Sequence, residues 1–421
     1  MEKSYICIDL KSFYASVECV ERNLDPFKTN LVVADPERSR STICLAITPA
    51  MKKLGVKNRC RIHEIPGNIS YITAMPRMQL YIDYSARIYS IYLSFVAPED
   101  IHVYSIDECF IDVTDYLKLY GVSAVELAER MMRKVFESTG ITATAGVGSN
   151  LYLAKIAMDI LAKHVRNNIG VLDEISYRKR MWTHMPLTDF WRIGPGTARS
   201  LAGYGAYTMG DVADMSLKCE EVLYKQFGVD AELLIDHAWG YEPCTMRDIK
   251  NYHPSVKCLS SGQVLMRNYT ADEGIVVVKE MTDFLVMDMV EKRLSTDSIT
   301  LYLSYDHRSG DASSVGSTNL IYSTNSSRRI LSEIEELYWK IVKRQGQLRR
   351  INITFNHVVK EEWIQYDMFS TAEDVEREKN LQKSILKIRK RYGKNAILRG
   401  CNLYECSNAV ERNRQIGGHK A

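Results

Sequence analysis

Residues 5–18 read YICIDLKSFYASVE, and this stretch decides the fold that we predict for the N-terminal part of the chain. Tyr5 to Asp9 form a short run of β-forming residues, which predicts a buried strand that ends in an acid. Ser12 is a residue type that caps helices, and the segment FYASVECVER that follows predicts a helix. The chain thus begins with a strand, a carboxylate at its end and a helix.

A second pair of carboxylates lies in similar surroundings. Asp107 and Glu108 stand between VYSI and CFIDV, which predict a hairpin or two adjoining strands over residues 103–113. A carboxylate among apolar residues is costly unless it is paired or bound to a metal ion. Acids gathered at one sheet edge suit hard cations, and two such ions activate an attacking oxygen and stabilise a leaving phosphate oxygen. Taken singly, Asp9 as a helix cap and Asp107–Glu108 as a turn remain the alternative interpretation.

The periodicity up to residue 172 predicts a mixed domain with an insertion. Strands are expected at 31–34, 41–48 and 141–147, and helices at 49–54, 76–97, 123–139 and 151–163. Without residues 27–75, this order suits a sheet with helices packed on one face. We therefore assign residues 1–26 and 76–172 to one domain and residues 27–75 to an inserted subdomain.

Three further segments follow, and the fold class is α+β. Residues 173–240 predict short helices, two of them around the Gly-Pro-Gly turn of IGPGTARSLAGYG at 193–205. Residues 241–254 hold two prolines and few apolar residues, which is typical of a linker. Residues 255–358 follow the βαββαβ order of the split βαβ layout. Residues 359–421 end in a basic helix and a polar tail.

Composition and charge exclude several classes of protein. With 46% hydrophobic and 25% charged residues, the chain is neither disordered nor fibrous. Residues 371–421 carry twelve Lys or Arg and six Asp or Glu, which suits a polyanionic partner or simply a solvated tail. No run approaches ~18–20 apolar residues, so no membrane span is expected. Ten cysteines without a CxxC pair, and an N-terminus without a signal-peptide pattern, predict a cytoplasmic protein.

Three ordered motifs resemble those of the Y-family DNA polymerases, the UmuC/DinB group. They are DLKSFYASVE (9–18), SIDECFID (105–112), and GVGSN (146–150) followed by LAKIA (153–157). The family's right-hand architecture would make 1–26 and 76–172 the palm, 27–75 small fingers, 173–240 a thumb with a helix-hairpin-helix, and 255–358 a little finger. The closing IGGHKA is similar to tails of UmuC-like proteins of Gram-positive bacteria.

The resemblance also implies metal and nucleotide ligands. Asp9, Asp107 and Glu108 would hold two Mg²⁺ ions, with Mn²⁺ as a possible substitute, and Leu10 would add its backbone carbonyl. Tyr14, beside Phe13, would be the steric gate that excludes a ribose 2′-hydroxyl, because a packed ring leaves no room for an added oxygen. Lys52 and Lys163 would be the cations that bind the triphosphate. Ile43 and Leu45 would cover the nascent base pair.

Ordinary structural roles remain the alternatives for these residues: a core aromatic, surface lysines and core aliphatics. The chain also departs from the family at two positions. Pro49 stands where many members have a tyrosine, so a hydroxyl contact to phosphate is absent or supplied elsewhere. Leu151 stands where the third motif often has a lysine, which weakens one charge contact but not the metal site.

Contacts with DNA would come from two regions. Gly194, Gly196 and Thr197 in the thumb would let backbone N–H groups approach a phosphate at a helix N-terminus. In the little finger, Ser260, Ser261 and Arg267 flank an exposed strand, and Arg350 belongs to a second strand with an outward polar face. Such a polar, basic sheet face would track the phosphate backbone. A plain helix turn and a solvated sheet face are the alternatives.

The segment QYDMF at 365–369 resembles the pentapeptide that binds the bacterial sliding clamp. Met368 and Phe369 would enter a groove while Gln365 forms hydrogen bonds. The alternative is a loop whose apolar side chains pack on the protein itself. Apart from the clamp or accessory proteins, we expect a monomer.

Together these features predict a low-fidelity DNA polymerase that extends primers past damaged template bases. Its substrates would be primer-template DNA and deoxynucleoside triphosphates. Two alternatives stay open: a nucleotide cyclase on a palm-like fold, and a catalytically inactive UmuC-like protein that binds DNA and the clamp. The helix-hairpin-helix, the extra domain and the clamp motif speak against the first, and the intact acids Asp9, Asp107 and Glu108 against the second.

Overall fold

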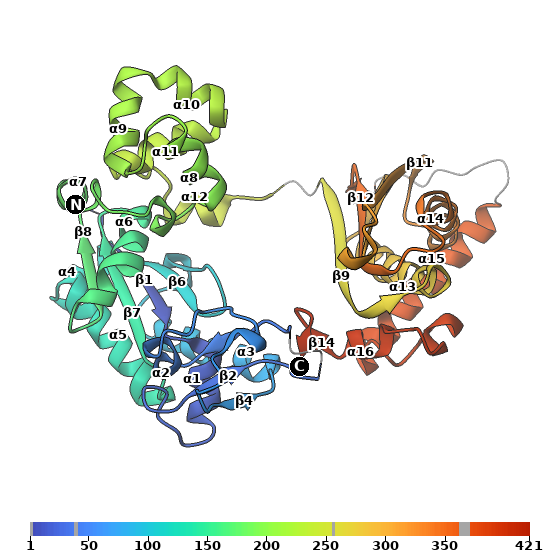
Figure 1. The fold of residues 1–421 in the computed structure, drawn as a ribbon, viewed down its shortest axis with the longest axis horizontal. Coiled ribbons are helices and arrows are strands. Elements are labelled where there is room, and N and C mark those ends of the chain that lie inside the picture. The colour runs from blue at the N-terminus through green and yellow to red at the C-terminus, as the bar shows by residue number, and fades with distance from the viewer. Residues whose placement is uncertain (1–2, 38–40, 255–256, 362–370) are drawn as a thin grey trace. The chain divides into compact units, whose positions relative to one another are not determined.

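The computed structural model describes residues 3–37, 41–254, 257–361 and 371–421. The chain divides into two compact units, one formed by Met1–Tyr252 with His419–Ala421 and the other by His253–Gly418. Both units combine helices with a sheet (Figure 1), as the α+β class predicts.

A five-stranded sheet forms the centre of the first unit. Its strands are, in spatial order, β5 (Ile101–Val103), β6 (Glu108–Asp112), β1 (Tyr5–Leu10), β7 (Ala143–Gly148) and β8 (Ile169–Leu172). β1 is antiparallel to both neighbours, whereas β8 is parallel to β7. The sequence predicts β1, β6 and β7, and the hairpin expected at 103–113 meets β5 only at Val103. It gives no strand for β8, which is only four residues long.

Helices cover both faces of this sheet, which corrects the prediction that they pack on one face. All six residues of β7 are buried, so neither face of this strand meets solvent. On one face lies α6 (Leu151–Ile156), so close that a Cβ added to Gly146 would stand 2.0 Å from the carbonyl oxygen of Ala154. The other helices of this part are α1 (Phe13–Val20), α3 (Met78–Tyr92), α4 (Thr114–Tyr120) and α5 (Ala124–Thr139).

Two predicted helices begin where the sequence predicts but differ from the prediction in their capping or regularity. Ser12 has a left-handed backbone (φ 49°) and its side chain makes no capping hydrogen bond, so the predicted cap is wrong. The helix expected at 151–163 begins after Asn150, whose side-chain oxygen accepts from the N–H of Leu153 at 2.8 Å. It then changes to a π-helical turn at Ala157–Leu161 and a 3-10 turn at Ala162–His164. Such π turns are frequent at functional sites.

Residues 27–75 form a small subdomain with a three-stranded sheet of order β3-β2-β4. Its elements are β2 (Leu31–Val33), β3 (Ala46–Ile47), α2 (Pro49–Lys53) and β4 (Ile72–Ala74). β3 is shorter than the strand predicted at 41–48, because Ile43 forms only an isolated bridge with Arg61. Ile47 and Met51 are fully buried in a core that belongs to this subdomain.

Short helices make up the rest of the first unit. They are α7 (Glu174–Met181), α8 (Pro195–Ala202), α9 (Met209–Lys218), α10 (Glu220–Phe227), α11 (Asp230–Trp239) and α12 (Met246–Asn251). The predicted linker at 241–254 is therefore wrong over much of its length. Met246 of α12 is 3% exposed and packs in one cluster with Tyr5 and Phe110 of the central sheet. The division between the units falls near the end of this predicted linker, between Tyr252 and His253.

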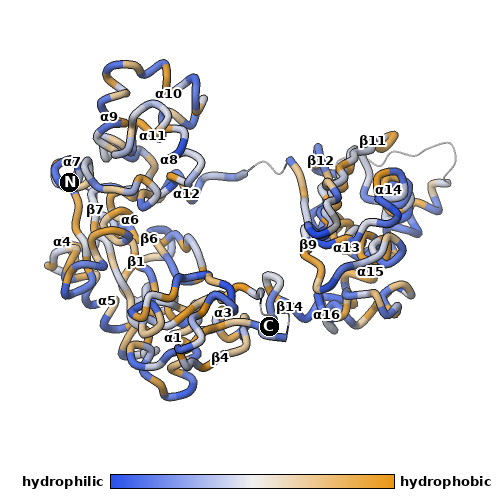
Figure 2. Tube along the Cα trace, viewed as in Figure 1, coloured by the Kyte–Doolittle hydropathy of each residue, from blue (hydrophilic) through white to orange (hydrophobic). Residues whose placement is uncertain are grey.

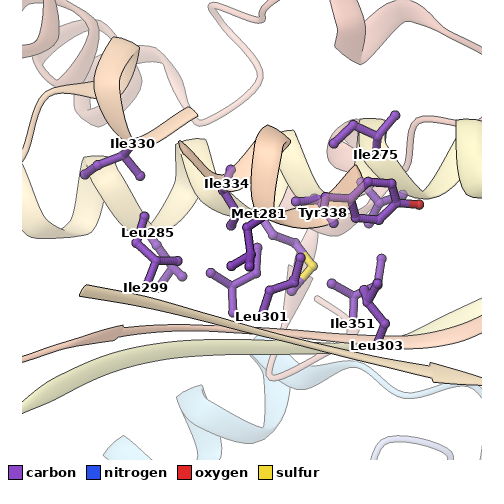
Figure 3. Close-up of a cluster of buried hydrophobic side chains, with 14 of the residues drawn as sticks. Ile275, Met281, Leu285, Ile299, Leu301, Leu303, Ile330, Ile334, Tyr338 and Ile351 are labelled. Carbon is purple, nitrogen blue, oxygen red and sulfur yellow. The ribbon is translucent and has the colours of Figure 1, made fainter. Parts of the chain in front are cut away.

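The second unit has the βαββαβ order that the sequence predicts. Its elements are β9 (Cys258–Tyr269), α13 (Ala271–Glu291), β10 (Leu294–Tyr305), β11 (Ser314–Thr324), α14 (Ser327–Ile341) and β12 (Leu348–Asn356). The sheet order is β11-β10-β12-β9, with β13 (Val359–Lys360) beside β10. Figure 3 shows Leu285 of α13 and Ile334 of α14 facing Ile299 and Leu301 of the sheet. This apolar core closes one face of the sheet.

The C-terminal segment is folded, and as far as Gly418 it belongs to the second unit, where it contacts α13. Its elements are α15 (Ala372–Tyr392), α16 (Ala409–Asn413), β14 (Gln415–Ile416) and β15 (His419–Lys420). Asp283 of α13 is 6% exposed and is ion-paired with Arg389 at 3.2 Å and with Arg399 at 2.6 Å. Part of the positive charge at the C-terminus therefore neutralises a buried acid of the second unit.

Hydrophobic and hydrophilic stretches alternate along the trace in both units (Figure 2). Among the described helices, none combines the length and the apolar character that a membrane crossing requires.

Candidate active site

Strand pairing brings Asp9 and Glu108 together. β1 and β6 are antiparallel, and their register places Asp9 opposite Glu108. Next to this pair, the backbone N–H of Leu10 donates to the carbonyl oxygen of Asp107 at 2.9 Å. Directly opposite residues of an antiparallel pair have Cβ atoms about 4.5–5.5 Å apart. Three acids from two distant segments therefore meet at one end of the central sheet.

The charges of these acids disfavour one another in the absence of a cation. Burial, together with the negative charges of Asp107 and Glu108, raises the pKa of Asp9 to about 7. Burial also raises the pKa of Glu108. A divalent cation would remove this repulsion, and carboxylate oxygens are the donors that Mg²⁺ and Ca²⁺ prefer. The donor chemistry of the site thus fits a divalent ion.

The carboxylates are not gathered around a single point. Over residues 3–37, 41–254, 257–361 and 371–421, no three His, Cys, Asp or Glu side chains lie close enough to hold a metal ion together. Glu108 is engaged by Lys155, whose Nζ lies 2.8 and 2.9 Å from its two carboxylate oxygens. Asp107 accepts a hydrogen bond from the hydroxyl of Ser105 at 2.6 Å. Each of these two acids has a partner of its own.

Sequence reasoning missed Lys155 and Asp159, which belong to the same cluster. Lys155 is 7% exposed and lies 3.0 Å from a carboxylate oxygen of Asp159 in the π turn. Burial disfavours its ammonium, but the negative charges of Asp159 and Glu108, with the hydrogen bond to Glu108, outweigh burial and raise the pKa of Lys155. A lysine and an acid four residues apart in the otherwise apolar stretch after Asn150 were the available signal.

Tyr14 lies at the start of α1, next to the acids. Its ring stacks on that of Tyr81 with centroids 4.5 Å apart, and the buried ring of Phe13 lies 5.8 Å away. Burial and the charge of Asp107 raise the pKa of Tyr14, whereas Arg59 acts in the opposite direction. Arg59 is thus a cation near this ring that sequence reasoning did not single out.

The two lysines predicted to bind phosphate are electrostatically coupled to the acid cluster through Lys52. Burial lowers the pKa of Lys52, Asp9 raises it, and Lys163 lowers it further, so the three groups are within electrostatic range. Lys52 belongs to α2 and Lys163 to the 3-10 turn after α6. In the neighbouring subdomain, Leu45 is half-buried and Ile43 is 47% exposed.

The predicted helix-hairpin-helix has one α-helix. Gly194 precedes α8, and Gly196 and Thr197 lie in its first turn. The preceding element is a 3-10 turn at Leu187–Asp189 instead of the predicted helix. A Cβ on Gly194 or Gly196 would meet nothing within 4 Å, so the backbone is open there. The first N–H groups of a helix have no partner within it.

On the sheet of the second unit, Ser260 and Ser261 point to opposite faces. Ser260 pairs with Thr354 on the outer face, whereas Ser261 pairs with Ile353, which is fully buried beneath the helices. Ser260 therefore lies on the outer face of the sheet and Ser261 does not. Arg350 lies on the outer face and is exposed.

Arg267 of β9 forms an ion pair with Glu273 in the first turn of α13. Its Nη2 lies 2.6 Å from a carboxylate oxygen of Glu273, and its guanidinium lies 4.2 Å from the centroid of the Tyr269 ring. It has a partner within the unit already. The predicted clamp-binding residues Gln365, Met368 and Phe369 lie outside the described residues.

Two family models match the chain. The impB/mucB/samB family matches residues 8–159, and the C-terminal domain of the same family matches residues 256–368. The first contains Asp9, Asp107, Glu108 and Lys155. Together the two models cover more than half of the sequence.

Relatives align along the whole chain. The putative UV-damage repair protein UvrX of Bacillus subtilis (strain 168) is 28% identical and covers 100% of this chain and 98% of its own length. DNA polymerase IV 2 of the same organism is 29% identical, with 99% of each chain covered. The solved "Y-family DNA polymerase chimera Dbh-Dpo4(243-245)-Dbh" has a similar fold, with a TM-score of 0.65, 23% identity, and coverage of 85% of this chain and 99% of that one. The comparisons favour neither a nucleotide cyclase nor an inactive accessory protein. The chain therefore belongs to the impB/mucB/samB family, the UmuC/DinB-like branch of the Y-family DNA polymerases.

Proposed function

We propose that the chain synthesises DNA on a template with low fidelity and extends primers past damaged bases, with Asp9, Asp107 and Glu108 as the ligands of two divalent cations. The observation that carries the proposal is the register of β1 and β6, which sets Asp9 opposite Glu108. The carbonyl of Leu10 is the further ligand, and Mg²⁺ is the ion that we expect, with Mn²⁺ as a substitute.

The chemistry follows from these positions. Divalent cations bound to the carboxylates would activate the 3′-hydroxyl of the primer and stabilise the leaving pyrophosphate. Lys52 and Lys163 supply positive charge for the triphosphate. Tyr14 lies beneath the sugar and excludes a ribose, while Ile43 and Leu45 cover the nascent base pair.

Primer-template DNA is held by backbone and sheet rather than by base-specific contacts. The N-terminus of α8 at Gly196 and Thr197 suits a phosphate, and the outer sheet face with Ser260 and Arg350 suits the sugar-phosphate backbone. Residues 365–369 bind the sliding clamp, and the protein acts as a monomer apart from such partners.

Primer extension with Mg²⁺ on undamaged and damaged templates tests the proposal. Asp107→Ala should abolish extension and keep DNA binding. Asp115→Ala, which removes an exposed acid of α4, serves as the matched control and should extend like the unmodified protein. Undiminished synthesis by Asp107→Ala would refute the ligand assignment, and product from nucleotide alone, without DNA, would favour a cyclase.

A further inference from the structure

The ring of Tyr14 rests on a second ring that is itself locked in place. Tyr81 of α3 stacks on Tyr14 with an interplanar angle of 17°, and it is fully buried. Stacked aromatic rings attract each other beyond the effect of the apolar area that they bury. The side of the Tyr14 ring that faces Tyr81 is therefore closed.

A buried carboxylate fixes Tyr81. The hydroxyl of Tyr81 donates to Oε1 of Glu18 at 2.7 Å, and Glu18 is fully buried. Arg77 binds both oxygens of the same carboxylate, with Nε at 2.9 Å and Nη2 at 2.7 Å. Arg22 donates to it as well. The forked contact of an arginine with a carboxylate is directional, so Glu18 and the hydroxyl of Tyr81 have little freedom to move.

Helix geometry connects this network to the active site. Tyr14 and Glu18 are four residues apart on α1 and so lie on one face of that helix, opposite Arg77 and Tyr81 at the start of α3. Burial disfavours the charge of Glu18, but the hydrogen bonds from Arg77, Tyr81 and Arg22 outweigh it and lower the pKa of Glu18. The carboxylate thus stays charged and holds both arginines and the tyrosine near neutral pH.

A steric gate excludes ribonucleotides only if its ring cannot move away from the sugar. An added 2′-hydroxyl can be accommodated when the ring beneath the sugar shifts by a fraction of its own thickness, whereas close packing behind the ring prevents that shift. We propose that Tyr81, held by Glu18 and Arg77, is a positioning residue that backs Tyr14 and thereby sets the discrimination against ribonucleotides. This inference rests on the proposed role of Tyr14.

Single-nucleotide incorporation measures the discrimination against ribonucleotides. The ratio of kcat/KM for a deoxynucleoside triphosphate to that for its ribonucleoside counterpart is compared between variants. Tyr81→Leu removes the backing ring and should lower this ratio by roughly tenfold, since small misplacements at a reacting centre have effects of this size or more. Tyr81→Phe keeps the stack, loses the bond to Glu18 and should lower the ratio by a smaller factor. Both variants should keep most of their activity with the deoxynucleotide.

The chain offers a matched control between the same two helices. The hydroxyl of Tyr84 donates to Oε1 of Glu21 at 2.7 Å, three residues further along each helix, in an exposed position. Tyr84→Phe removes this bond without touching the ring behind Tyr14, and its ratio should equal that of the unmodified protein. In a Tyr14→Ala background, Tyr81→Leu should have no further effect on the ratio.

The outcomes separate the inference from the proposed function. A relaxed ratio in Tyr14→Ala with an unchanged ratio in Tyr81→Leu overturns the inference and leaves the gate in place. An unchanged ratio in Tyr14→Ala overturns both. If Tyr81→Leu and Tyr81→Phe lower kcat/KM by the same factor for the deoxynucleotide and the ribonucleotide, the role of Tyr81 is purely structural and the inference is overturned. If Tyr81→Leu does not fold, Tyr81→Phe with its retained ring decides, and an unchanged ratio there overturns the role of the bond to Glu18.

Discussion

Lys155 and Glu108 form an enclosed ion pair at the acid cluster: both side chains are 9% exposed, and Nζ lies 2.8 Å from a carboxylate oxygen. Lys155→Met would leave Glu108 and Asp159 without their cation. We expect the free energy of unfolding in chelator to fall by about 3–5 kcal/mol, the usual effect of breaking a buried pair from one side. Urea unfolding at pH 8 measures the change.

Lys218→Met is the control for that measurement. Lys218 pairs with Asp214 four residues away at 3.2 Å, but the two side chains are 74% and 62% exposed. Its loss should change the free energy of unfolding by no more than about 0.5 kcal/mol. Mg²⁺ should restore more stability to Lys155→Met than to the unmodified protein, because it would replace the lost positive charge. Equal effects of the two lysine variants would contradict the importance of the buried pair.

Asp9 makes stability depend on pH when no metal is bound. Its pKa of about 7 in the folded protein exceeds the roughly 3.9 of an exposed aspartate, so folding favours the protonated form. The penalty of ionised Asp9 therefore grows as pH rises from about 4 to about 7 and then levels off. Asp9→Asn should raise the melting temperature in chelator most at pH 8 and much less at pH 5. Thermal unfolding at both pH values decides, and a gain that does not depend on pH would count against the raised pKa.

The ion pairs of Asp283 test whether the C-terminal segment belongs to the second unit. Asp283→Ala leaves Arg389 and Arg399 without their shared partner, and we expect a loss of roughly 2 kcal/mol in the unfolding of that unit. Glu291→Ala is the control. Glu291 of α13 pairs with Lys390 of α15 at 2.7 Å, so this ion pair joins the same two helices as Asp283 and Arg389, but in an exposed position. Chemical unfolding followed by circular dichroism compares the two. Similar small losses in both would show that the segment contributes little through these charges.

Deletion of residues 365–369 tests the proposed clamp contact. Synthesis stimulated by the sliding clamp should fall, while synthesis on a short primed template without the clamp should stay unchanged. A deletion variant that responds to the clamp like the full chain would remove this partner assignment.

Much of the fold followed from the sequence because its periodicity is clear. The buried run at Tyr5–Asp9 and the βαββαβ order of residues 255–358 could be predicted because alternation and helical spacing are local properties. β8 and α12 could not, since short elements are defined by what they pack against. The contacts of the basic C-terminal segment were unpredictable for a similar reason: two of its arginines, Arg389 and Arg399, pair with Asp283, which lies far away in the sequence.

The candidate site was predictable in its acids but not in its electrostatics. Asp9, Asp107 and Glu108 stood out as carboxylates among apolar residues. That Lys155 holds Glu108 depends on how α6 crosses the sheet, where Gly146 and Gly148 let the helix approach. The backing of Tyr14 by Tyr81 likewise depends on the packing of α1 against α3. Neither relationship has a local signature in the sequence.

The packing of α12 against Tyr5 and Phe110 has a practical consequence for hybrids made from this chain and its relatives. If the two parents are joined at residue 241, where composition indicates a linker, the residue at position 246 comes from the parent that supplies the second unit. Tyr5 and Phe110 of the other parent then lose the Met246 side chain with which they pack. A crossover at His253 leaves that contact within one parent, so exchanged halves should retain the melting behaviour of the proteins they came from.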